Sequence, residues 1–173
     1  VPFKKGIDSY EKKQYEVAIS EFSKVPLHGE HYSEAQHYLD LINYKILYDQ
    51  LRISYKNSHD SKSNQYNQSE EIKFNYDIVL ISKLVNIAEK MEDSKKVLES
   101  FDIVISGIKN SSSRIQTEDF LILFEKIVSR NKEKSIHEKA LNFLLADFGK
   151  LYQQVEIRPK VFQLVGNLKM ELM

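Results

Sequence analysis

The chain contains no cysteine, and it has only five glycines and three prolines among its 173 residues. The absence of cysteine excludes disulfides, thiol catalysis and zinc–thiolate sites. Glycine and proline are the residues that most often interrupt regular structure, so their scarcity favours helices over a β fold rich in turns. No apolar run approaches the roughly 20 residues that a membrane-spanning helix needs.

Charge of one sign is also lacking, because 25 Lys and Arg balance 25 Asp and Glu. A nucleic-acid-binding domain normally shows a basic excess or a basic face, and neither is present here. Phosphate-binding loops, nucleophile elbows and dinucleotide-binding fingerprints are missing as well. The sequence therefore predicts a non-enzymatic protein with no catalytic residues, no metal site and no cofactor.

The length and the 42% hydrophobic content fit one soluble domain or two small ones, each able to bury a core. The first residues lack an initiator methionine and do not form a signal peptide. We therefore expect the chain to be a mature or trimmed fragment.

Apolar residues recur at helical spacing near the N-terminus. One stripe comprises Tyr15, Ala18, Ile19, Phe22 and Val25, and the next comprises Ala35, Tyr38, Leu39 and Ile42. Steps of three and four residues place each stripe on one side of a helix. The pattern predicts a short helix that ends at residues 12–14, a second over about 14–25, and a third from residue 30 or 31 to about 54.

The first stripe resembles a tetratricopeptide repeat, whose motif reads Gly-x-Tyr-x-x-Ala-Ile-x-x-Phe-x-x-Ala. Tyr15, Ala18, Ile19 and Phe22 match this motif, and Gly6 matches the small residue of the preceding helix. Lys13 and Val25 replace the turn glycine and the last alanine, and the family's tryptophan and distal proline are missing. The resemblance covers about the first quarter of the chain.

Within that family, the stretch is most similar to repeats of bacterial envelope assembly proteins. In those repeats a helix of the form Tyr-x-x-Ala-x-x-Tyr follows, as Tyr32, Ala35 and Tyr38 do here. In composition the chain also resembles the N-terminal domains of spirochaete periplasmic proteins needed for cell fission and outer-membrane integrity. These resemblances imply a periplasmic scaffold or adaptor that binds other envelope proteins, with a cytoplasmic location as the alternative.

The rest of the chain divides into a polar segment and a series of apolar stripes. Residues 56–69 are almost without aliphatic side chains and predict a loop between two subdomains, or alternatively a solvated helix extension. After residue 70 the stripes predict further helices, with Thr117 and Ser135 as N-terminal caps and Pro159 in a first helical turn. The residues expected to face inward include Val79 on the first of these helices, and Tyr152 and Phe162 on the last ones.

No stretch alternates with period two, so no strand is predicted. The expected fold is all-α and consists of helical hairpins. A tetratricopeptide-like hairpin and a long third helix occupy residues 1–55, and a helical bundle occupies residues 70–173. The long third helix leaves spectrin-like three-helix bundles as the alternative architecture.

The candidate partner-binding site is a stripe on the third predicted helix, made of Tyr44, Tyr48, Arg52 and Tyr55. Aromatic residues and arginine contribute most to protein interfaces, so this stripe binds a partner if it is exposed. The alternative is that it packs into the interior of the hairpin or against the second subdomain.

Two further clusters have a structural and a functional interpretation. His28, Glu30, His31, Glu34 and His37 are the one concentration of metal-ligand types, but a polar helix start explains them better than a zinc site. A basic group, Lys4, Lys5, Lys12 and Lys13, suits either solvated surface or an anionic partner.

Taken together, the helical pattern predicts a protein–protein interaction scaffold, and the resemblances imply that it belongs to the bacterial envelope and supports outer-membrane integrity or cell division. A rigid spacer domain is the alternative, and a metal-dependent protein is a more distant one.

Overall fold

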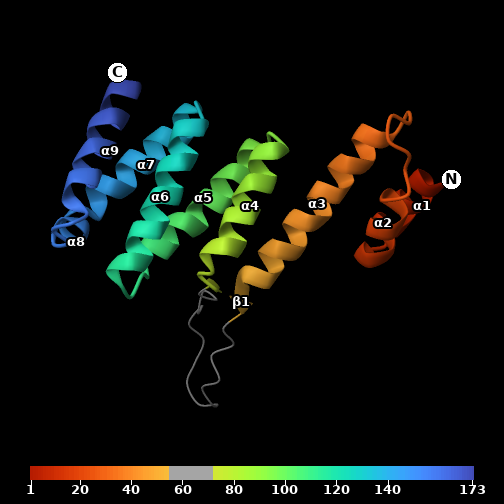
Figure 1. The fold of residues 1–173 in the computed structure, drawn as a ribbon, viewed down its shortest axis with the longest axis horizontal. Helices are drawn as coiled ribbons and strands as arrows, with labels where there is room; N and C mark the ends of the chain where they lie inside the picture. The colour runs from red at the N-terminus through yellow and green to blue at the C-terminus, as the bar shows by residue number, and fades with distance from the viewer. Residues whose placement is uncertain (55–71) are drawn as a thin grey trace, which may run out of the picture. The chain divides into compact units, whose positions relative to one another are not determined.

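The computed structural model describes residues 1–54 and 72–173, and these form an all-α fold of helical hairpins, as predicted (Figure 1). The helices are α1 (Pro2–Glu11), α2 (Tyr15–Phe22), α3 (Tyr32–Leu51), α4 (Ile78–Lys90), α5 (Ser94–Lys109), α6 (Arg114–Arg130), α7 (Lys134–Ala146), α8 (Phe148–Tyr152) and α9 (Arg158–Glu171). Every helix in the described ranges is too short or too polar to cross a membrane.

The chain divides into two compact units that share α4. The first unit comprises Val1–Asn75 with Asn86–Glu92, and the second comprises Tyr76–Val85 with Asp93–Met173. The predicted polar segment, residues 56–69, lies outside the described residues.

In the first unit, α1 and α2 form a hairpin and α2 packs against α3. The predicted inward residues build the core: Ala18, Phe22, Val25, Ala35 and Ile42 are buried, and Tyr15, Ile19, Tyr38 and Leu39 pack around them. The Phe22 ring stacks on Tyr38, with centroids 5.0 Å apart. The periodicity of the sequence therefore identified this core correctly.

The ends of these helices differ from the prediction. Helix α2 ends at Phe22 rather than near Val25, and α3 ends at Leu51 rather than near Ser54. The next residues form a short strand, β1 (Arg52–Ser54), which pairs antiparallel with β2 (Ile72–Phe74). The prediction of no strands is wrong here because strands of three residues are too short to show period-two alternation.

The second unit is built around the pairs α5–α6 and α7–α9. The rings of Phe101, Phe124 and Phe143 pack in sequence, with successive centroids 5.1 and 5.7 Å apart. Val79, which was predicted to face inward, is exposed, whereas Ile81 on the same helix is fully buried. The face of α4 that enters the core is therefore turned relative to the predicted one.

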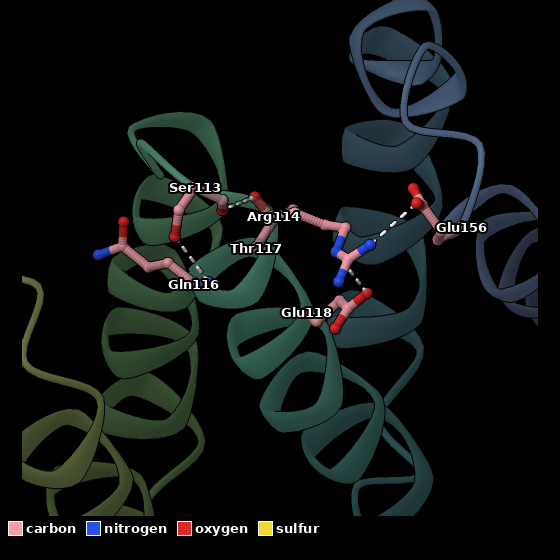
Figure 2. Close-up of polar contacts among 6 residues, drawn as sticks. All are labelled: Ser113, Arg114, Gln116, Thr117, Glu118 and Glu156. Carbon is pink, nitrogen blue, oxygen red and sulfur yellow. Dashed lines mark hydrogen bonds and ion pairs between the residues drawn. The ribbon is translucent and has the colours of Figure 1, made fainter.

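Two predicted helix caps are wrong. Helix α6 begins after Ser113, whose hydroxyl accepts a hydrogen bond from the backbone N–H of Gln116 at 3.2 Å (Figure 2). Thr117 lies one turn inside the helix, and its hydroxyl donates to the Ser113 carbonyl at 2.9 Å. Helix α7 starts at Lys134, one residue before Ser135, so that serine cannot cap it. Pro159 lies in the first turn of α9, as predicted.

In the α1–α2 hairpin and in the α5–α6 hairpin, a phenylalanine of the second helix packs directly on a glycine of the first. A Cβ added at Gly107 on α5 would lie 2.6 Å from the ring of Phe120, which is fully buried on α6. In the first unit, Gly6 and Phe22 have the same relationship, also at 2.6 Å. These glycines allow each pair of helices to approach closely.

We expect Gly107→Ala to destabilise the protein. Overpacking costs about 1–3 kcal/mol, more than the ~1 kcal/mol by which alanine otherwise favours a helix over glycine. The net loss should be on the order of 1 kcal/mol in urea denaturation. Gly166→Ala on α9 is the matched control, because nothing lies within 4 Å of its added Cβ. This control should be neutral or stabilising by up to about 1 kcal/mol. If both substitutions stabilise equally, the close contact at Phe120 does not restrict the site.

Candidate protein-binding surface

The predicted stripe on α3 is not a continuous exposed row. Tyr44 is only 4% exposed, and its ring stacks on Tyr48 with centroids 6.3 Å apart. The half-buried Tyr48 also meets the edge of Phe74, 5.9 Å away. Arg52 is exposed, and Tyr55 lies outside the described residues. A partner-binding role of this stripe stays a prediction, but Tyr44 and Tyr48 pack within the first unit.

The histidine cluster lies around the start of α3. The His31 ring stacks on Phe3 with centroids 4.4 Å apart, and its Nδ1 lies 3.6 Å from a Glu34 carboxylate oxygen. Across residues 1–54 and 72–173, no three side chains of the metal-ligating types converge on one point. The basic group, Lys4, Lys5, Lys12 and Lys13, is exposed along with its acidic neighbours Asp8 and Glu11.

A groove of about 500 Å³ lies between α6, α7 and α9. His137 lies in its wall, buried, and its Nε2–H donates to the carbonyl of Val128 at 3.1 Å. Glu125, Lys132 and Glu171 give the rim charges of both signs. Because the buried His137 ring is already hydrogen-bonded to the end of α6 and so connects α7 to it, we assign this groove a structural role.

Large exposed side chains gather instead around α8 and the start of α9. Tyr152 is 42% exposed, Val155 is 62% exposed and Phe162 is 54% exposed. The Tyr152 and Phe162 rings meet at 88°, with centroids 6.0 Å apart. The Arg158 guanidinium lies over the Tyr152 ring, 4.2 Å from its centroid, and its Nε–H donates to the Tyr152 carbonyl. We call Tyr152, Val155, Arg158 and Phe162 the α8–α9 surface.

The sequence of α9 explains why this surface is exposed. Val161, Leu164 and Leu168 are spaced by three and four residues, and all three are buried. That spacing defines the inward face of the helix, so Arg158 and Phe162, four residues apart, share a different face. Pro159 favours the helix start, since its fixed φ fits a first turn.

The connection before α9 is fixed by an ion pair to another helix. Arg114 at the start of α6 lies 2.9 Å from the Glu156 carboxylate, and its Nε lies 3.6 Å from Glu118 (Figure 2). The Glu156 carboxylate accepts a hydrogen bond from the backbone amide of Glu156 and another from Arg114. These bonds, together with the positive charge of Arg114, hold the pKa of the Glu156 carboxyl below its ordinary value. The ion pair of Arg114 therefore holds the α8–α9 connection, which contains Val155, against the start of α6.

The predictions that Tyr152 and Phe162 face inward are wrong. The apolar stripes that predict this also contain buried residues, but Tyr152 and Phe162 each lie next to a buried residue in the sequence and point to a different side of their helix. In α9 the signal was available, because Val161, Leu164 and Leu168 already complete one helical face and leave Phe162 outside it. In α8 the helix is only five residues long, so periodicity could not orient Tyr152.

Comparison with models of protein families, with curated proteins and with solved structures finds no match to this chain. The tetratricopeptide resemblance therefore depends on the matching residues of the first hairpin.

We expect Glu156→Gln to lower stability at neutral pH, with a difference from the wild type that disappears in acid. Because the pKa of Glu156 is depressed in the folded state, its carboxylate stabilises the fold above the ordinary glutamate pKa. That stabilisation is lost as the pH falls through the lower folded-state value. Urea denaturation of both proteins across this pH range measures the difference.

Glu171→Gln is the control, since no cationic side chain of the described ranges pairs with this exposed glutamate. It should show no such pH-dependent difference. A Glu156→Gln difference that stays constant into acid would contradict a role for the Arg114 ion pair.

Proposed function

We propose that this chain is a non-enzymatic scaffold of the bacterial cell envelope that binds another protein through the α8–α9 surface. The observation that carries the proposal is the exposure of two large aromatic rings, Tyr152 and Phe162, held in a fixed arrangement with Arg158. Tyrosine and arginine are enriched among the residues that dominate binding energy at protein interfaces.

The geometry favours binding for an energetic reason. Burying a phenylalanine side chain contributes about 1.5–3 kcal/mol, and half of the Phe162 surface is still available to a partner. The T-shaped contact with Tyr152 and the overlying Arg158 already restrict these side chains. A partner therefore meets a surface that loses little further side-chain entropy on binding.

The envelope location is supported by the tetratricopeptide-like hairpin. Its matching residues Ala18 and Phe22 are buried, and Tyr15 and Ile19 pack around them. In the repeats that this stretch resembles, such hairpins hold envelope proteins together. We therefore propose that the partner is an envelope component and that the complex supports outer-membrane integrity or cell division.

The test compares what three forms of the protein retain from an envelope extract of the source bacterium. The forms are the wild type, Tyr152→Ala with Phe162→Ala, and the control Ile122→Ala, which shortens an exposed side chain on α6. Quantitative mass spectrometry measures the retained proteins, and circular dichroism checks that helix content is unchanged.

We expect at least one envelope protein to be retained by the wild type and the control but to fall about tenfold or more on the double variant. A tenfold loss corresponds to about 1.4 kcal/mol, less than two interface aromatics commonly contribute. Equal retention by all three forms would contradict the proposal and favour the rigid spacer.

A further inference from the structure

One face of α9 combines apolar and cationic side chains. Arg158, Phe162, Val165 and Lys169 follow one another in steps of four, three and four residues, which places them along one side of the helix. Phe162 and Lys169 are exposed, and Arg158 and Val165 are half-buried. We call these four residues the α9 stripe; it continues the α8–α9 surface along the helix.

Two of the carboxylates near this stripe are paired with other cations. Glu156, two residues before Arg158, points to Arg114 (Figure 2). Glu125 on α6 pairs with Lys160, which lies on the other flank of α9. Neither carboxylate pairs with a cation of the stripe, and Glu171, the one carboxylate of α9, lies outside ion-pair distance of Lys169.

The cations of the stripe, in contrast, have no carboxylate. Within residues 1–54 and 72–173, no Asp or Glu side chain lies within 4.0 Å of Arg158 or Lys169. Lys150 on the adjacent α8 also makes no ion pair within the part of the chain that the structure describes. Its ammonium instead donates a hydrogen bond to the backbone carbonyl of Lys109 at 2.5 Å. Arg158 and Lys169 are therefore not engaged in ion pairs within the described residues, although the chain as a whole carries equal numbers of positive and negative side chains.

We propose that the α9 stripe binds an acidic segment of the partner protein, in which Asp or Glu residues flank a large apolar side chain. This inference rests on the proposed function and specifies the chemistry of the partner. The apolar side chain packs on Phe162 and Val165, and the carboxylates pair with Arg158 and Lys169 at either end. Arginine suits this role because its planar guanidinium binds a carboxylate through two parallel hydrogen bonds.

A second copy of this chain is a poorer occupant. A twofold dimer brings the same patch of both subunits together, so the cations of one stripe would face those of the other. Like charges opposed across an interface disfavour association. An acidic segment meets the same surface without that repulsion.

The test is a selection from a phage library of random 15-residue peptides on the immobilised wild-type chain. Each enriched peptide is then synthesised, and its affinity is measured for the wild type and three variants. Arg158→Glu with Lys169→Glu reverses the stripe charges, and Phe162→Ala removes the ring. Lys83→Glu with Lys126→Glu is the matched control, since it changes the net charge equally at exposed lysines on α4 and α6.

We expect the enriched peptides to be acidic and to contain large apolar residues. Their affinity should fall at least tenfold for the charge reversal and for Phe162→Ala, and should change little for the control. Binding should also weaken between 50 and 500 mM salt, because exposed ion pairs are screened. If the double reversal does not fold, Lys169→Glu alone and the salt dependence make the same distinction.

Three outcomes overturn the inference in different ways. Peptides that need Phe162 but are neutral or basic would refute the acidic partner and leave the protein-binding function standing. No enrichment, or enrichment of peptides that bind all variants equally, would contradict both. Co-sedimentation with phosphatidylglycerol vesicles that depends on Arg158 and Lys169, without any such peptide, would assign the stripe to a membrane surface and overturn the inference as well.

Discussion

The close approach of two helices through a glycine is the constraint on which each unit depends. Phe22 and Phe120 lie where the Cβ of any other residue would stand at Gly6 and Gly107. Each ring is fully buried, and burying a phenylalanine contributes about 1.5–3 kcal/mol. Because the chain has few glycines, using two of them in this way shows how strictly the hairpins require a short distance between their helices.

The packing of the second unit also determines what remains outside. Val161, Leu164 and Leu168 turn one face of α9 into the core, and the short α8 packs beside it. No further place is left inside for Phe162, so the ring stays on the surface and packs against Tyr152. The α8–α9 surface is therefore a consequence of how the core of this unit is filled.

Much of the fold could be predicted from the sequence, because apolar periodicity is the strongest signal that a helical chain carries. The core of the first hairpin, with Ala18, Phe22 and Ile42, followed directly from it. The signal failed where an element is too short to show a period, as in β1 and β2. It also failed at the caps, since several serines and threonines near a helix start have the right chemistry and only the backbone decides between Ser113 and Thr117.

The candidate surface was harder to predict than the fold for a related reason. The stripe predicted on α3 combines tyrosines with an arginine, residue types that are enriched at protein interfaces, yet Tyr44 is buried. A similar combination of aromatic rings and an arginine occurs in Tyr152, Arg158 and Phe162, but Tyr152 belongs to α8 and the other two residues to α9. They come together because α9 packs against α8 after the connection that joins the two helices.

The position of the surface on a helix has a consequence for recognition. Side chains on regular elements are held more precisely than those on loops, so Arg158 and Lys169 keep a fixed spacing along α9. With a net charge of zero, the chain has no long-range field that attracts acidic proteins in general. Selectivity for an acidic partner must therefore arise at short range, where the cations flank Phe162 and Val165 and a segment has to match both charge and apolar contact at once.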